Sequence, residues 1–332
     1  MPITVVGSIA YDTVKTPFGE RERMLGGAAV HFALAASFFD EVRVVGPVGE
    51  DFGEEQLEVL RGRGVDVADV EHVSGGKTFF WRGEYGWDLN SRETLDTQLG
   101  VFEGFSPKLS EGSRSSDVLF LANIQPDLQH DVRLQMAHAR FVALDSMNLW
   151  IDIARDSLVR AIECVDCLIL NDAELRQLTG KASLLAAARE VLSWSPSEAA
   201  GDGAGELRGP SVVVAKQGEY GAALVTRDGF FALPAYPLES VVDPTGAGDT
   251  FAGGFVGYIA AQTGTGGAAE GQPITDELLR RAMAYATVLA SFNVEEFGTE
   301  RVQRLQGGEI AWRIEELHQV TQFSGTPVQL RA

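Results

Sequence analysis

The chain has 332 residues, 45% of them hydrophobic, and a formal net charge of −20 from 47 acidic and 27 basic residues. This length and apolar content suffice for one large α/β domain. The negative charge excludes sequence-independent binding to nucleic acid, which needs clustered Lys and Arg. No stretch reaches 18 uninterrupted apolar residues, and the first residues lack a signal-peptide pattern. We therefore expect no membrane span and a cytoplasmic location.

Short apolar runs alternate with helical patterns along the first half of the chain. Buried-strand patterns are found at residues 3–6, 42–45, 118–121, 141–144 and 168–170. Helical patterns are found at residues 28–39 and 54–61, and further helical segments lie between the later strands. This alternation predicts a mostly parallel sheet with crossover helices.

Residues 72–105 interrupt this alternation with a β-prone, aromatic segment. We predict an inserted β element over the sheet edge, joined by residues 11–23. Its aromatic residues could stack on a bound base or sugar face, or form the small core of the element itself: Phe79, Phe80, Trp81, Tyr85 and Trp87. Further along the chain, residues 212–215 and 222–226 predict a hairpin, and residues 195–210 and 263–272 predict surface loops.

The cysteines and histidines show no metal-binding pattern. Cys164 and Cys167 form one Cys-x-x-Cys, but no second pair completes a zinc site. We interpret both as small buried apolar residues. The five histidines, His31 among them, lack ligand spacing, so we assign them no role and predict no structural metal.

The run Asp-Pro-Thr-Gly-Ala-Gly-Asp at residues 243–249 carries the strongest functional signal. Apolar residues at helical spacing follow it, so we expect a helix that begins near Thr245. Glycines at a helix start leave backbone N–H groups open to an anion, and the helix dipole favours negative charge there. Asp249 then places a carboxylate beside the anion, which suits transfer of a phosphoryl group to a hydroxyl. The alternative is a Gly-rich turn in which Asp249 only complements the dipole.

The same helix contains Gly253, Gly254 and Gly257. Each costs about 1 kcal/mol relative to Ala in a helix interior, so we expect close packing of this helix against the sheet. The spacing excludes two other phosphate motifs. A dinucleotide fingerprint would need Gly at position 251, which is Phe251, and a Walker A loop ending at Lys77 would need Gly at position 71, which is Glu71.

Three motifs together resemble the ribokinase-like (PfkB) carbohydrate and nucleoside kinase family: Gly26-Gly27, Asn171-x-x-Glu174 and the run at 243–249. The resemblance extends from Val5 to about Gly298. It implies a single kinase domain over residues 1–332 with a three-layer α/β/α fold, a mostly parallel central sheet and a small β lid from about 11–23 and 72–105.

The resemblance also implies roles for individual residues. Asp249 would be the general base, and the backbone N–H groups of Gly246, Ala247 and Gly248 would form the anion hole. Asp12, Gly26 and Gly27 would bind the acceptor. The nucleotide and its metal would be held by Asn171, Glu174, Lys216, Gly218 and Gly221. Glu174 would bind Mg²⁺ through water, and Asp243 with Thr245 would contribute to a site for a monovalent cation such as K⁺.

Residues 171–174 have a purely structural alternative. Asn at a helix N-cap with Glu three residues later is close to a capping box. The chain also departs from the family pattern at three places. Gly26-Gly27 is followed by Ala-Ala-Val-His, where sugar-specific members often carry Asn. Lys216 stands where Thr or Ser is common, and Glu295-Glu296 would lie near a phosphate-binding region.

The implied activity is ATP- and Mg²⁺-dependent phosphorylation of a hydroxymethyl group on a sugar or sugar-like molecule. The alternative within the same fold is a nucleoside kinase, and the alternative from another class is a non-catalytic nucleotide or sugar sensor. A homodimer formed through the lid is also expected. The sequence does not distinguish a sugar from a nucleoside acceptor.

Overall fold

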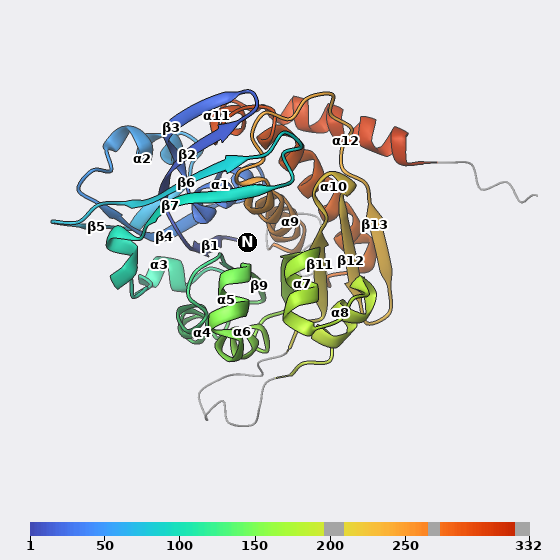
Figure 1. Ribbon diagram of the computed structural model, residues 1–332. Helices are drawn as coiled ribbons and strands as arrows, with labels where there is room; N and C mark the ends of the chain where they lie inside the picture. Colours follow the sequence, from blue (N-terminus) through green and yellow to red (C-terminus); the bar gives the residue numbers. More distant parts are fainter. Residues whose placement is uncertain (196–208, 265–272, 323–332) are drawn as a thin grey trace, which may run out of the picture.

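The computed structural model describes residues 1–195, 209–264 and 273–322 (Figure 1). A nine-stranded sheet forms the centre, and all neighbouring strands from β11 to β5 are parallel, whereas β11, β12 and β13 pair antiparallel. The strands in spatial order are β13 (Phe230–Leu233), β12 (Ala222–Thr226), β11 (Val212–Lys216), β10 (Cys167–Asn171), β9 (Phe141–Asp145), β8 (Val118–Leu121), β1 (Ile3–Val6), β4 (Val42–Gly49) and β5 (Asp66–Val73). The predicted mostly parallel sheet and the hairpin after residue 212 are confirmed.

Helices cover both faces of this sheet, as the predicted three-layer fold requires. Successive strand residues face opposite sides, so Val5 joins one hydrophobic core and Val6 the other. The first core is covered by α1 (Ala28–Ala36), α2 (Glu54–Arg61), α9 (Ala247–Thr263), α10 (Asp276–Asn293), α11 (Glu300–Gln303) and α12 (Gly307–Thr321). The second core is covered by α4 (Pro126–Gln135), α5 (Asn148–Ile153), α6 (Arg155–Ile162), α7 (Asp172–Thr179) and α8 (Leu184–Val191). Short helices also occur at η1 (Gly100–Gly104), α3 (Glu111–Arg114) and η2 (Gly218–Tyr220).

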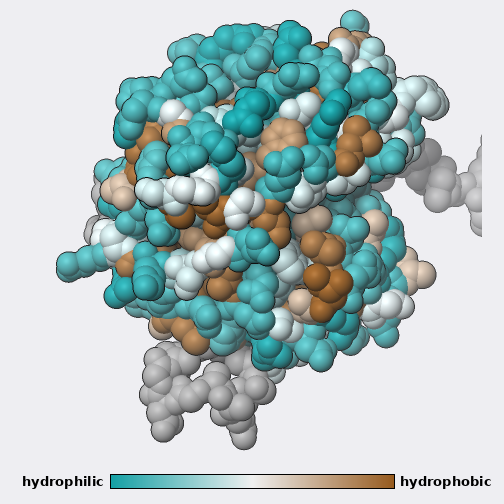
Figure 2. Space-filling view, turned by 60° about the vertical axis from the view of Figure 1, so that its left-hand side comes forward, coloured by the Kyte–Doolittle hydropathy of each residue, from teal (hydrophilic) through white to brown (hydrophobic). Residues whose placement is uncertain are grey.

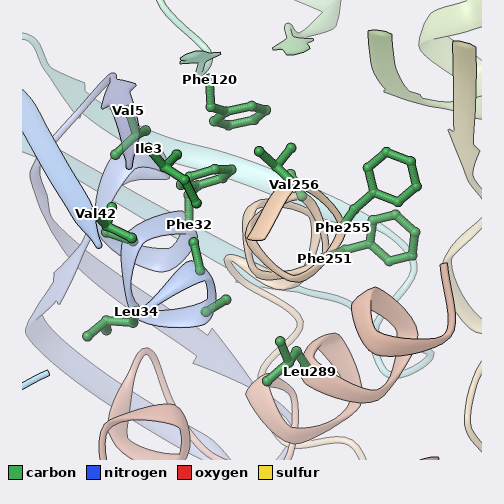
Figure 3. Close-up of a cluster of buried hydrophobic side chains, with 14 of the residues drawn as sticks. Ile3, Val5, Phe32, Leu34, Val42, Phe120, Phe251, Phe255, Val256 and Leu289 are labelled. Carbon is green, nitrogen blue, oxygen red and sulfur yellow. The ribbon is translucent and has the colours of Figure 1, made fainter. Parts of the chain in front are cut away.

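Aromatic side chains fill the first core between the sheet, α1 and α9 (Figure 3). Phe32 of α1 stacks on Phe120 of β8, with ring centroids 4.1 Å apart. Phe255 and Val256 of α9 are fully buried in the same cluster. The burial of both helices around one cluster fixes α9, which carries Asp249, against α1, which follows Gly26-Gly27.

The glycines of α9 allow its backbone to touch two neighbouring helices. A Cβ atom on Gly253 would lie 2.4 Å from the carbonyl oxygen of Phe32, and one on Gly254 would lie 2.9 Å from Cα of Ala286. A Cβ atom on Gly257 would lie 3.1 Å from Cα of Ala36. The prediction of close packing is correct, but its partner was wrong, because the glycines face α1 and α10 rather than the sheet.

A second, four-stranded sheet lies over one edge of the first core. Its strand order is β3 (Gly19–Gly26), β2 (Ala10–Thr16), β6 (Phe79–Tyr85) and β7 (Arg92–Gln98), with β2 and β6 parallel. We call it the small sheet. It draws on both segments that the sequence indicated, but residues 72 and 73 end β5 of the main sheet instead.

Most aromatic side chains of the small sheet pack against other hydrophobic side chains of the protein. Tyr85 is buried with Phe297, and Trp81 packs half-buried against the same cluster. Phe79 packs on Phe102 of η1, and Phe80 packs against the main core. Trp87 alone of the five predicted aromatic residues is largely exposed, at 89%. Tyr85 and Trp81 therefore belong to the small core of the element, whereas Phe79 packs on η1 and Phe80 joins the main core.

Several predicted boundaries shift. Helix α1 ends at Ala36 instead of residue 39, and α9 begins at Ala247 because Gly246, its N-cap, has a left-handed conformation. Thr263 closes α9 and is not a loop residue. The rest of the two predicted surface loops falls mostly at 196–208 and 265–272, outside the described residues. Cys164 and Cys167 are both free and buried, as expected.

One face of the molecule is mostly hydrophilic (Figure 2). Figure 2 shows that hydrophobic groups form small patches among polar side chains on this face. Within the described part of the chain, no helix combines the length and apolar character needed to cross a bilayer.

Candidate active site

Three neighbouring parallel strands end in polar residues at one edge of the central sheet. Asp145 is the last residue of β9, Asn171 of β10 and Lys216 of β11. Lys216 Nζ lies 2.8 Å from Asp145 Oδ2, in a largely buried ion pair. Burial alone would lower the pKa of Lys216, but the carboxylates around it, Asp145 foremost, raise it. This edge is where ligands bind in open α/β sheets.

Asn171 and Glu174 close the N-terminus of α7 as a capping box. Asn171 Oδ1 accepts a hydrogen bond from the Glu174 backbone N–H at 2.7 Å, and Glu174 Oε2 accepts one from the Asn171 N–H at 2.9 Å. The structural interpretation of this pair is therefore correct. Burial, followed by the nearby charge of Asp145, raises the pKa of Glu174 to about 7. Glu174 Oε1 has no hydrogen bond to any described residue, so the cap leaves one carboxylate oxygen available.

The loop before α9 exposes backbone donors beside Lys216. Gly246 is left-handed, with φ 74°, and neither its N–H nor that of Gly248 has a hydrogen-bond partner among the described residues. Ala247 N–H differs, because it donates to the carbonyl oxygen of Pro244 at 3.2 Å. A Cβ atom on Gly248 would lie 3.1 Å from Lys216 Nζ, so the ammonium group lies against this loop. We call residues 245–248 the anion loop.

Asp249 lies in the first turn of α9, directly after the anion loop. Burial and the neighbouring charge of Asp145 raise its pKa to about 7, while Lys216 acts in the opposite direction. A carboxylate with a pKa near the working pH can both accept and release a proton. Asp249 is therefore electrostatically coupled to the ion pair at the strand ends.

Asp12 enters the same region from the small sheet. It is 7% exposed, lies in β2 and accepts a hydrogen bond from the backbone N–H of Gly27. Burial, and then the charges of Asp243 and Asp249, raise its pKa to about 7. A Cβ atom on Gly26 would lie only 1.9 Å from Asp12 Oδ2. The structure thus brings the predicted acceptor residues and Asp249 within electrostatic reach of each other.

The predicted glycines near the nucleotide site form a turn after β11. Gly218 and Gly221 have φ of 57° and 99°, and a Cβ atom on Gly221 would lie 2.0 Å from the carbonyl oxygen of Leu233. The connection between β6 and β7 touches this turn, because Asn90 Nδ2 donates to Glu219 Oε1 at 3.2 Å. The small sheet therefore spans from the acceptor residues to the turn that follows Lys216.

Asp243 and Thr245 hold the start of the anion loop. Asp243 is buried, and its two oxygens accept hydrogen bonds from the N–H groups of Thr245 and Gly298, both at 2.9 Å. Thr245 Oγ1 lies 3.3 Å from Tyr85 Oη of the small sheet. Asp243 thus links the loop to the segment after α10, and Thr245 links it to the small sheet.

Three features of the site were missed at the sequence level. Asp145 could have been found, since it directly follows an apolar strand pattern. Arg92 of β7 could not: it lies over the Trp81 ring at 5.4 Å, and its positive charge acts against the burial that raises the pKa values of Asp12 and Glu174. The third is His31, which contacts the anion loop although we had assigned it no role.

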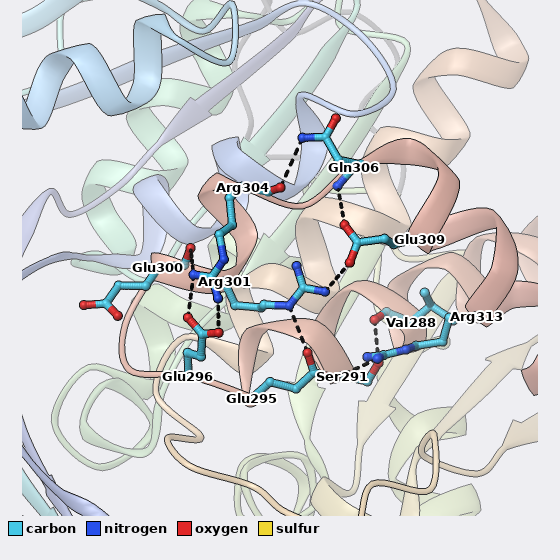
Figure 4. Close-up of polar contacts among 10 residues, drawn as sticks. All are labelled: Val288, Ser291, Glu295, Glu296, Glu300, Arg301, Arg304, Gln306, Glu309 and Arg313. Carbon is cyan, nitrogen blue, oxygen red and sulfur yellow. Dashed lines mark hydrogen bonds and ion pairs between the residues drawn. The ribbon is translucent and has the colours of Figure 1, made fainter.

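The two glutamates after α10 do not present free charge. Glu295 pairs with Arg301 at 3.0 Å and with Arg313 at 2.7 Å, and Glu296 pairs with Arg304 (Figure 4). The sequence suggested unfavourable carboxylates near a phosphate. The arginines of α11, α12 and the segment between them neutralise these carboxylates, which removes that objection.

The structure thus places a helix start with open backbone N–H groups, a carboxylate and a lysine together at the carboxyl edge of an α/β sheet, an arrangement that suits binding of a phosphate group. The pfkB family carbohydrate kinase model matches residues 3–304, and the chain belongs to this family. The chain is 30% identical over 265 residues to the cytidine kinase of Thermococcus kodakarensis, covering 78% of this chain and 88% of that protein. It is 24% identical over 314 residues to the nucleoside kinase of Methanothermobacter thermautotrophicus, covering 90% and 91%. The adenosine kinase of Sinorhizobium meliloti has the same fold, with a TM-score of 0.74 at 17% identity over 95% of this chain and 98% of that one.

Proposed function

We propose that this kinase transfers the terminal phosphoryl group of ATP to the hydroxymethyl group of a nucleoside. One observation carries the catalytic part of the proposal. The Asp249 carboxylate follows an anion loop with two open N–H groups, and the Lys216 ammonium lies against that loop. Base, anion donors and fixed positive charge are the parts that phosphoryl transfer requires.

In the proposed reaction, Asp249 accepts the proton of the acceptor hydroxyl. The hydroxyl oxygen forms a bond to the γ-phosphorus, the bond to the β–γ bridging oxygen breaks, and ADP leaves with that electron pair. The N–H groups of Gly246 and Gly248 donate to the oxygens of the transferring group. The N–H group of Ala247 can donate to the same oxygens only after its hydrogen bond to the Pro244 carbonyl oxygen breaks. Lys216 holds phosphate from the strand side.

Glu174 and Asn171 are the residues suited to hold Mg²⁺. The open carboxylate oxygen of Glu174 lies in a region already rich in carboxylates, and Mg²⁺ prefers such oxygens together with its own water. When bound, the ion would neutralise charge on the ATP phosphates. Gly218 and Gly221 would shape the turn that receives the nucleotide.

Asp12 and Gly27 are proposed to bind hydroxyl groups of the acceptor. Asp12 is buried and its carboxyl accepts a bond from Gly27 N–H, which leaves its remaining acceptor capacity for a ligand. Gly26 provides the space for this carboxyl. The small sheet would then act as a lid over the acceptor.

The choice of a nucleoside rests on the relatives. The protein 30% identical to this chain is named a cytidine kinase, and the one that matches 90% of the chain is named a nucleoside kinase. A sugar acceptor is the second candidate, since the family is described as carbohydrate kinases. A panel of nucleosides and free sugars in one ATP-consumption assay separates them. A free sugar with kcat/KM tenfold above every nucleoside would reject the nucleoside proposal.

The role of Asp249 is tested by Asp249→Asn, with Asp276→Asn, an exposed acidic residue at the start of α10, as the matched control. General-base catalysis is typically worth about 10²–10⁴-fold. We expect kcat to fall at least 10²-fold in Asp249→Asn and to stay within twofold in the control. A loss below tenfold would show that Asp249 is not the base. Ligand-induced stabilisation of the unaltered protein without product would instead identify a sensor.

Two further expectations are kept as proposals. Asp243 and Thr245 would border a K⁺ site, which predicts faster turnover in K⁺ than in Na⁺ at equal ionic strength. Strand β7 lies at an edge of the small sheet, and all seven of its residues are exposed, which supports a homodimer through this sheet. A monomeric mass in solution would reject the dimer.

A further inference from the structure

Asn293, the last residue of α10, is fully buried beneath the anion loop. Its Nδ2 donates to the carbonyl oxygen of Thr245 at 2.8 Å. Its Oδ1 accepts from Thr250 Oγ1 at 3.0 Å and lies 3.1 Å from His31 Nδ1. One amide thus connects the loop, the first turns of α9 and helix α1.

These contacts determine the tautomer of His31. Because the Asn293 amide donates to a carbonyl on one side, its oxygen faces His31, and Nδ1 must carry the proton. Nε2 is then an unprotonated acceptor, and it is buried without a partner among the described residues. Burial lowers the pKa of His31 to about 4, so the ring is neutral. An unpaired acceptor is tolerated more often than an unpaired N–H, which agrees with this tautomer.

The His31 ring also limits where the loop can lie. A Cβ atom on Gly246 would lie 2.3 Å from His31 Nδ1, so the ring is in direct contact with the backbone of Gly246. The same glycine has the left-handed conformation that leaves its N–H open. The loop is therefore fixed by a hydrogen bond at Thr245 and by ring contact at Gly246.

We propose that His31 and Asn293 are a coupled pair of positioning residues that hold the anion loop in the shape that receives the transferring phosphoryl group. The proposal rests on the proposed function of that loop. Neither residue needs to touch the substrate. Their effect is on the direction of the Gly246 and Gly248 N–H groups, on which charge stabilisation in the transition state depends.

The pair is tested with Asn293→Ala, His31→Ala and the double variant, with Ser291→Ala as the control. Ser291 is buried in the same helix, but it bonds to Arg313 and the Val288 carbonyl instead of the loop. We expect kcat to fall about 10–100-fold in each single variant, because small misplacements cost about that much. The KM for the acceptor should change less than threefold, and Ser291→Ala should keep kcat within twofold.

The double variant should lose no more than the worse single variant, because both substitutions release the same loop. Losses that multiply, or a kcat within threefold in folded Asn293→Ala, would overturn the proposal. Should the alanine variants not fold, ¹⁵N-histidine NMR of the unaltered protein provides a second test. The His31 signal is assigned as the one that disappears in His31→Gln. A proton on Nδ1 of this ring supports the proposed pair, and a proton on Nε2 overturns it. If Asp249→Asn also retains activity, the proposed function fails, whereas the NMR result stays interpretable.

Discussion

The carboxylate of Asp12 occupies the place that a side chain on Gly26 would take, with only 1.9 Å between Oδ2 and a Cβ atom at that glycine. The two residues belong to paired strands of the small sheet, in which Ala10 pairs with Gly26. The position of the Asp12 carboxylate, which is proposed to bind the acceptor, therefore depends on the absence of a methyl group at Gly26.

Gly26→Ala should displace Asp12 and weaken acceptor binding. We expect the KM for the acceptor to rise at least tenfold while the KM for ATP stays within threefold, measured by steady-state kinetics. Gly104→Ala is the control, because a Cβ atom there meets nothing within 4 Å. An unchanged acceptor KM in Gly26→Ala would remove Asp12 from the acceptor site.

Glu174→Gln separates the capping role of this residue from its metal role. Gln can still accept the hydrogen bond from Asn171 N–H, so the melting temperature at pH 4.5, where the carboxyl of folded Glu174 is protonated, should stay within 2 °C. Loss of the charge should raise the Mg²⁺ concentration for half-maximal rate at least tenfold. Glu174→Ala should show the same metal defect and also lose about 1 kcal/mol of stability with the cap. An unchanged Mg²⁺ dependence in both variants would contradict the metal role.

Lys216→Met leaves Asp145 buried without its partner. Breaking a buried ion pair from one side typically costs about 3–5 kcal/mol. Urea unfolding should show a loss in this range at pH 8 and a smaller one at pH 5.5, where the unpaired carboxyl can take a proton. Lys216→Met combined with Asp145→Asn should recover most of the stability. Equal losses at both pH values would show that the pair is not the cause.

The raised pKa of Asp249 predicts the pH dependence of the reaction. The base must be ionised, so kcat/KM should rise with pH and level off above about pH 7. Asp12 and Glu174 titrate in the same range, so the apparent pKa belongs to the cluster. A profile flat from pH 5 to 8 would contradict this assignment.

The same shifts predict the sign of the stability change. A carboxyl whose pKa is raised on folding stabilises the fold below its unfolded pKa near 4, and this contribution is lost as pH rises through about 7. Asp249→Asn should therefore melt a few °C higher than the unaltered protein at pH 8 and at nearly the same temperature at pH 4.5. A higher melting temperature at both pH values would indicate another cause.

The sequence was sufficient for the layers of the fold, because apolar strands and helix patterns alternate without ambiguity. It was also sufficient to place Asp249 and the glycines before it at a helix start, since that pattern lies in adjacent positions. The sequence was not sufficient to predict contacts in the site between residues that are far apart along the chain. His31 and Asn293 are 262 positions apart, and nothing in either local pattern indicates the contact.

A local sequence pattern also does not show which atoms are already engaged in hydrogen bonds or ion pairs. The motif suggests three equivalent N–H donors, but Ala247 N–H is engaged with Pro244. Similarly, the sequence suggests that Glu295 and Glu296 are unpaired, but in the structure they pair with arginines of α11, α12 and the segment between them. In both cases the sequence does not indicate which neighbouring residue forms the hydrogen bond or ion pair.

The three glycines of α9 bring this helix into backbone contact with α1 and α10. These backbone contacts fix its position together with the side chains of the surrounding core. The small sheet, which carries Asp12 and Arg92, ends in strand β7, whose seven residues are all exposed and where substitutions cost little stability. On the proposed roles of Asp12 and Asp249, substitutions that alter acceptor preference would accumulate in this sheet while Asp249 stays in place, so that specificity and chemistry would evolve separately.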